Sequence, residues 1–250
     1  SLTALGFNST SSFVAGLILA SALSTFQRYP TLLTLVPAAI GLRGNVMGGL
    51  GNRLSTAIHT GTFSVSIRNG TLMRQNVSAS LALSSVLSFV LAIIASVVAS
   101  AFGIESNLNL GQLAMVSIVG GLSASILVLI ATVALTVVGV RRNWDLDNLV
   151  APSVSTLGDV ITVPTLFLAS LALGLPAGAI TTVGWVLAAA SVAWFVVALR
   201  SRLPVLSQVC KESAPILVVA AALSTMAGVV VTKQLSAFAL LPALFILQPA

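Results

Sequence analysis

The sequence predicts an all-α fold, a polytopic bundle of transmembrane helices, and three observations lead to this class. Hydrophobic residues fill 57% of the 250 positions and charged residues only 6%, too little polar surface for a soluble globule. Mean hydropathy is +1.11. The apolar runs are long and lack the period-two alternation of a barrel strand, so they should be helices, which satisfy their own backbone hydrogen bonds in lipid.

Eight apolar runs are predicted to span the membrane. In chain order they cover 11–27, 30–52, 77–102, 111–139, 149–174, 178–199, 214–231 and 235 to the end. The gaps after the second, fourth and sixth spans hold most of the basic residues, namely Arg68, Arg74, Arg141, Arg142, Arg200, Arg202 and Lys211. By the positive-inside rule these gaps are cytoplasmic, so we expect a multi-pass protein of the cell membrane with a cytoplasmic N-terminus.

The net charge of +6 is explained by this orientation, since the basic residues lie in short gaps between apolar runs. We therefore expect the lipid bilayer as the surrounding partner and no nucleic acid. Cys210 is the one cysteine of the chain, so neither an internal disulfide nor a cysteine-based metal site is possible.

The fifth span carries a carboxylate, Asp159, near its middle. An acid at the centre of a membrane helix costs about 2.5–3.5 kcal/mol and usually faces a partner, a cavity or an ion. Ser155, Gly158 and Thr162 are three or four residues away, so the helix should have one narrow polar stripe. The alternative is a structural carboxylate that is hydrogen-bonded within the bundle.

The second span is rich in glycine around Gly44 and Asn45. Glycine lets helix backbones approach closely or break, and Asn45 adds a neutral oxygen ligand. At about 1.5 Å per residue, Asn45 lies about 12 Å and Asp159 about 15 Å from the cytoplasmic side. Both residues can therefore belong to one site. For the neighbouring Arg43, snorkelling or pairing with a carbonyl is the favoured reading.

An internal repeat appears when the end of the chain is laid over its beginning. Ala22-Leu-Ser-Thr25 recurs as Ala222-Leu-Ser-Thr225, and Pro30 to Ala38 corresponds to Pro242 to Ala250. We predict a first five-helix repeat at 1–176, a linking helix at 177–205, and the beginning of a second, parallel repeat at 206–250. We expect the natural chain to continue, with a Gly-x-x-Gly-Asn turn within about ten positions.

Two motifs resemble the MgtE family of magnesium channels and transporters, especially its two-repeat solute-carrier branch. The first runs from Val36-Pro-Ala38 through Gly41-Leu-Arg-Gly44-Asn45 to Arg53-Leu-Ser-Thr56, and the second from Asp147-Asn-Leu-Val-Ala-Pro152 to Leu157-Gly-Asp159-Val-Ile-Thr162. The resemblance implies that Asp159 is the main Mg²⁺ ligand, supported by Asn45, Gly44 and Ser155. The cytoplasmic gating domains of bacterial MgtE have no counterpart in this sequence.

Magnesium suits this residue set, because Mg²⁺ retains much of its water and needs only one or two carboxylates. We expect a Mg²⁺ channel or transporter whose pore is lined by the second and fifth helices and completed by a second repeat or a homodimer partner. The alternatives are a proton- or sodium-coupled carrier of another small substrate, and a structural subunit. A membrane enzyme is disfavoured, because acid–base chemistry needs paired titratable groups. For His59 a metal role is disfavoured as well.

Overall fold

The computed structural model of the chain describes residues 28–62, 71–104, 107–142 and 146–235, together with 13, 17 and 25. Over this part it is all-helical, as predicted, and contains no β-strand. The helices are α3 (Pro30–His59), α4 (Leu72–Ala101), α5 (Leu110–Arg141), α6 (Leu146–Leu171), α7 (Ala177–Leu199) and α8 (Pro204–Leu235), with a 3₁₀ turn, η1 (Ala172–Gly174), after α6. All six α-helices of the described part are long and apolar enough to cross a membrane.

Most of the helices extend beyond the predicted apolar spans, because a helix continues into the polar interface where the hydropathy signal ends. The second span was expected to end at Asn52, yet α3 continues to His59. The largest difference is at α8, which begins at Pro204 rather than at position 214. Proline at the first helical position has no N–H to leave unsatisfied, so Pro204 starts the helix ahead of a polar first stretch. The predicted spans at 11–27 and after Leu235 lie essentially outside the described residues.

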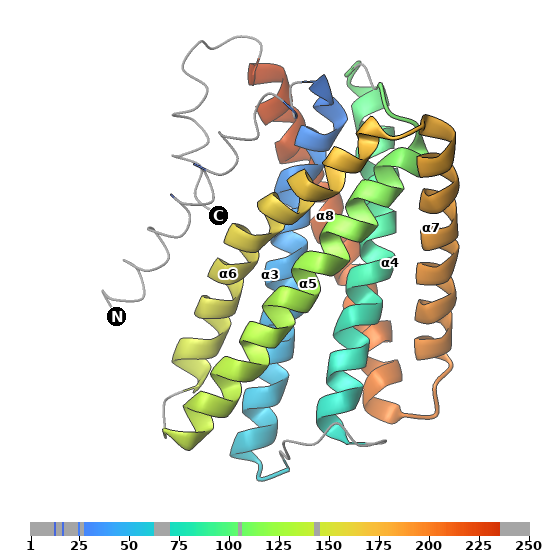
Figure 1. Cartoon of the computed structure of the whole chain (residues 1–250). Helices are drawn as coiled ribbons and strands as arrows, with labels where there is room; N and C mark the ends of the chain where they lie inside the picture. The colour runs from blue at the N-terminus through green and yellow to red at the C-terminus, as the bar shows by residue number, and fades with distance from the viewer. Residues whose placement is uncertain are drawn as a thin grey trace.

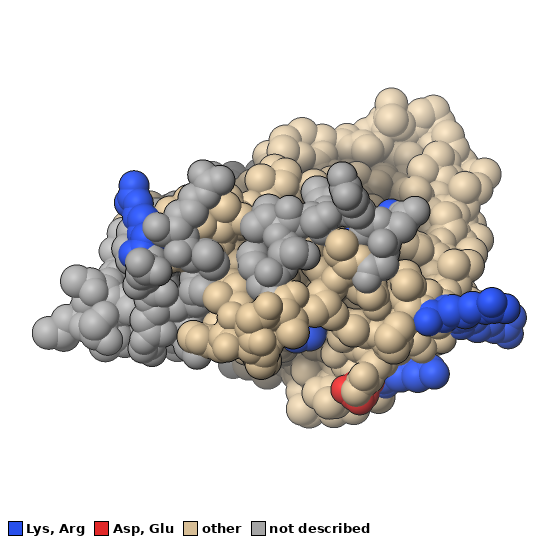
Figure 2. Space-filling model, turned by 90° about the horizontal axis from the view of Figure 1, so that it is seen from below, with Lys and Arg blue, Asp and Glu red and all other residues tan. Residues whose placement is uncertain are grey.

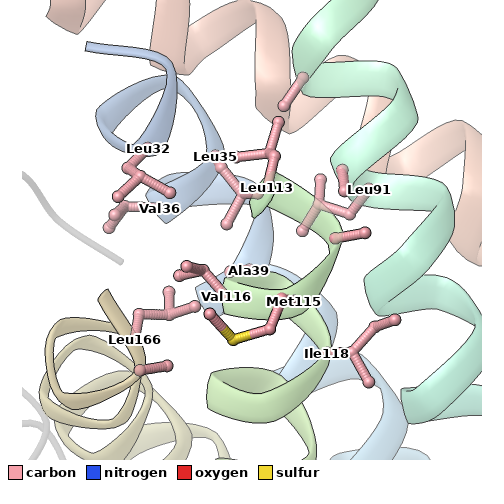
Figure 3. Packing of buried hydrophobic residues seen from close by; sticks show 14 of the residues in the cluster. Leu32, Leu35, Val36, Ala39, Leu91, Leu113, Met115, Val116, Ile118 and Leu166 are labelled. Carbon is pink, nitrogen blue, oxygen red and sulfur yellow. The ribbon is translucent and has the colours of Figure 1, made fainter. Parts of the chain in front are cut away.

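The helices run alternately up and down in one bundle, with α3 in contact with α4, α5, α6 and α8 (Figure 1). Helix α7 packs on α4 and α5 at the edge of the bundle. A central position is expected for α3, since most of its large side chains are buried. The core near the start of α3 joins α3, α4, α5 and α6, as Figure 3 shows for Leu35, Leu91, Met115 and Leu166.

Small residues set the closest helix contacts. A Cβ atom on Gly120 of α5 would lie 2.9 Å from Cα of Leu166 on α6, so only glycine permits this approach. On α8, a Cβ on Gly228 would meet the carbonyl of Thr34 on α3, and the hydroxyls of Thr34 and Thr232 are hydrogen-bonded at 3.1 Å. Close packing of small residues with interhelical hydrogen bonds is how helices associate in lipid, where burial from water does not drive association.

Basic side chains are segregated to one end of the bundle. Arg74, Arg142, Arg200, Arg202 and Lys211 lie where α4 and α8 begin and where α5 and α7 end, all at the lower end in Figure 1. Figure 2, which views this end, shows several basic side chains on it. The predicted alternation of basic and non-basic gaps therefore places most of the described basic residues on one side. The exceptions are Arg28 and Lys233, near the other end of the helices, and Arg43, which is buried within α3.

Candidate functional site

The site expected from the sequence lies where α6 crosses α3. A Cβ atom on Gly158 would lie 3.5 Å from the backbone nitrogen of Gly44 and 3.6 Å from Cβ of Arg43. The segment that contains Asp159 is therefore level with Gly44 and Asn45. The two motifs, more than a hundred residues apart in the chain, meet at the depth expected from the helix rise.

Asp159 is buried, with 6% of its surface exposed. Its carboxylate has no hydrogen bond and no ion pair with any described residue. A hydrogen-bonded structural carboxylate, the alternative considered from the sequence, finds no partner in this part of the chain. In this place the carboxyl group is either protonated or, when ionised, compensated by a bound cation or water.

The polar stripe expected around Asp159 is packed rather than wet. Thr162 is fully buried, and its hydroxyl donates a 2.5 Å hydrogen bond to the carbonyl of Gly158 on its own helix. Gly158 itself is pressed against α3. The helix position of Ser155 is described, one turn before Asp159, but its side chain lies outside the described part.

Pro164 lies inside α6, one turn after Val160. Proline has no N–H, so the carbonyl of Val160 lacks the usual helical donor from residue 164. The oxygen next to Asp159 in the chain is thus left available as a neutral ligand. Sequence reasoning missed this feature, although the proline one turn after the carbonyl was a readable signal.

On α3, the residues around the motif differ in exposure. Gly44 is half-buried against α6, whereas Asn45 is exposed. A Cβ atom on Gly48, one turn further on, would meet no described residue within 4 Å, so the described part of the chain leaves this face of α3 open. Asn45 also lines a cavity between α3, α4 and α8, to which no α6 residue contributes. The structure therefore places Asn45 and Asp159 at one level, on neighbouring faces of the α3–α6 pair rather than inside one closed pocket.

Arg43 is fully buried and points away from α6. Its Nη2 donates to Oγ of Ser88 on α4 at 2.7 Å, and its Nε donates to the carbonyl of Gly121 on α5 at 3.2 Å. The expected pairing with a carbonyl is present, while snorkelling to the surface is not. A Cβ atom on Gly121 would overlap the guanidinium group, so the glycine creates the space for it. Arg43 thus ties the backbone next to Gly44 to α4 and α5.

No group of three or more His, Cys, Asp or Glu side chains gathers anywhere in the described ranges. A cation at the α3–α6 crossing would be held by oxygen atoms around a single acid. Hard, oxygen-preferring divalent cations accept such a set when they keep part of their water.

Comparison with known families shows the family to which the chain belongs. The family model for MgtE, the divalent cation transporter, matches residues 36–169, more than half of the chain. The chain belongs to the MgtE family. The matched region runs from the motif on α3 to the helix that carries Asp159, and it makes the protein a divalent cation transporter rather than an enzyme. No solved structure matches the chain.

Proposed function

We propose that this MgtE protein moves partly hydrated Mg²⁺ across the membrane along a path lined by α3 and α6. Asp159 would be the main ligand, with Asn45, Gly44 and Ser155 in support. The observation that carries the proposal is a buried acid without a polar partner among the described residues, on the helix that contacts the Gly44 backbone. A divalent cation supplies the missing positive charge, and its water shell supplies the remaining oxygen atoms.

The path would be completed by a second copy of the same unit, either a second repeat in the chain or a homodimer partner. The open face of α3 at Asn45 and Gly48 supports this proposal, because a pore wall cannot face lipid. Two such faces would place two acids around one path. A single Mg²⁺ then balances both charges.

The basic end of the bundle would face the cytoplasm, which also places the N-terminus there. A potential of 100 mV, inside negative, then favours inward Mg²⁺ movement by about 4.6 kcal/mol, since each charge contributes about 2.3 kcal/mol. Uptake therefore needs no coupled ion. A coupled carrier, in contrast, would depend on a proton or sodium gradient.

The test is Mg²⁺ flux into liposomes that contain the full chain and an internal magnesium indicator. Asp159→Asn should lower the flux by about tenfold or more, because it removes the negative ligand. Glu212→Gln is the matched control: Glu212 is an exposed acid on α8 bonded only to the Gln208 side chain, and its loss should leave the flux unchanged. Equal flux in both variants would exclude Asp159 as the ligand. Flux that requires an imposed proton or sodium gradient would favour the coupled carrier.

A further inference from the structure

A cavity of about 320 Å³ lies beside the cation path, between α3, α4 and α8. It follows α3 from Asn45 to Arg53, eight residues or about 12 Å of helix. Ile216 on its α8 wall is 69% exposed, so the cavity opens toward the surroundings of the bundle. The residues between its two polar ends are mainly apolar, and the lining consists of Asn45, Val46, Gly49, Arg53, Leu83, Ser213, Ile216, Leu217 and Ala220.

Arg53 gives this cavity a fixed positive end. Its Nε donates to Oδ1 of Asn76 at 2.8 Å and its Nη2 donates to Oγ of Ser80 at 3.2 Å, both on α4. These bonds direct Nη1 toward Gly49, where a Cβ atom would lie 3.2 Å away. No carboxylate of the described residues pairs with Arg53. The guanidinium therefore presents an unpaired charge and a free donor to the cavity.

The positive charge of Arg53 excludes a cation from this end of the cavity and favours an anionic group. A cation would be repelled by Arg53, so this end of the cavity does not admit the transported ion. An anionic group would gain both the charge and the hydrogen bond. The apolar walls next to Arg53 suit a hydrocarbon chain. At about 30 Å³ for each group the size of a water molecule, such as a methylene, the cavity holds about ten groups, which is part of one acyl chain.

We propose that this cavity binds an anionic phospholipid, with the phosphate at Arg53 and an acyl chain between α3 and α8. The position of the charged end of the cavity agrees with a lipid headgroup. Arg53 lies at the end of the bundle that carries exposed Arg74 and Lys211, where lipid headgroups lie, and Asn45 lies deeper. Basic pockets between helices on the cytoplasmic side are the usual sites for anionic headgroups. The lipid site goes beyond the proposed cation path, and either can fail without the other.

The experiment titrates the detergent-solubilised full chain with phosphatidylglycerol and with phosphatidylcholine, and counts bound lipid by native mass spectrometry. We expect phosphatidylglycerol to be preferred. Arg53→Gln should weaken phosphatidylglycerol binding about tenfold or more, the effect of one charge-assisted hydrogen bond, and abolish the preference. Arg200→Gln removes an exposed charge from the same end outside the cavity, and should bind like the wild type.

A second pair of variants leaves Arg53 and its hydrogen bonds intact. Ala220→Phe fills the cavity and should reduce the binding of both lipids, whereas Ala227→Phe adds the same ring to an exposed position of α8 outside the lining and should not. Equal lipid binding by Arg53→Gln and Arg200→Gln, or by the two phenylalanine variants, would overturn the proposal. Displacement of phosphatidylglycerol by inorganic phosphate at matched concentration would overturn it too, since the site would then take a soluble anion.

Discussion

At the scale of single residues, the guanidinium of Arg43 is a charged group that lies fully buried in the bundle. Its two hydrogen-bond acceptors are also engaged elsewhere: Oγ of Ser88 donates to the carbonyl of Ser84, and the carbonyl of Gly121 accepts from Oγ of Ser125. Its Nη1 has no partner within the described residues. Ser88 and Gly121 therefore keep another hydrogen bond without Arg43, so the arginine brings a buried charge that its neighbours do not require.

This arrangement predicts that Arg43→Met is milder than the apparently conservative Arg43→Lys. Methionine removes the buried charge and leaves no neighbour unsatisfied, so stability should remain within about 1 kcal/mol of the wild type. Lysine keeps the charge but lacks the fork that reaches Ser88 and Gly121 together, and should cost about 2–3 kcal/mol. Unfolding in mixed micelles of increasing denaturing detergent measures both. A lysine variant more stable than the methionine variant would show that the charge itself stabilises the bundle.

At the scale of helices, α7 shows how an outer helix is attached in lipid. Its buried residues are mostly small, including Gly184, Ala188 and Ser191, whereas several of its large residues, such as Trp185 and Val197, are exposed. A Cβ atom on Gly184 would overlap the backbone of Gly111 on α5, and Oγ of Ser85 on α4 donates to Oγ of Ser191 at 2.6 Å. Close backbone approach and interhelical hydrogen bonds, with little burial of large apolar side chains, therefore attach α7 to the bundle.

Gly184→Leu should therefore detach α7 from α5. Forcing a large side chain into a packed contact costs about 1–3 kcal/mol, and we expect a value near the upper limit because the obstacle is backbone. Gly178→Leu, in the first turn of the same helix, meets nothing within 4 Å and serves as the control. Thermal unfolding in detergent should separate the two variants. Similar unfolding temperatures would mean that the Gly111–Gly184 contact does not hold α7.

At the scale of the whole molecule, the two ends of the bundle differ in charge. The lower end in Figure 1 carries most of the described basic side chains, and the same end contains Arg53 and the opening stretch of α8. One orientation in the membrane then fixes the direction of every helix. It would also decide from which side the ion reaches Asp159 in the proposed cation path.

The proposed orientation predicts opposite labelling of the two ends of α7. In a Cys210→Ser background, Gly178→Cys should react with an impermeant maleimide added to intact cells, because this end would face outward. Arg200→Cys, 22 residues or about 33 Å further along the helix, should react only after permeabilisation. Both positions are exposed. The reverse pattern would invert the assignment of the basic end to the cytoplasm.

Much of the fold could be predicted from the sequence, because hydropathy and chain length are local properties. The six described spans were all predicted, and the depth estimate for Asn45 and Asp159 agrees with the contact between Gly44 and Gly158. The polar stripe around Asp159 was predicted less well. Helical spacing gives the face of a residue but not what packs on that face, and here Gly158 and Thr162 pack within the bundle. The predicted repeat, the domain limits and the ligand set remain predictions.

The sequence by itself determined the all-helical membrane fold, the segregation of basic residues and the family, since each follows from residue types in order along the chain. The tertiary structure alone decided that Arg43 turns to α4 and α5, that α8 packs on α3, and that Arg53 borders a cavity. The physical reason is that partners across helices depend on which small residues allow two backbones to approach, and these partners are far apart in the sequence.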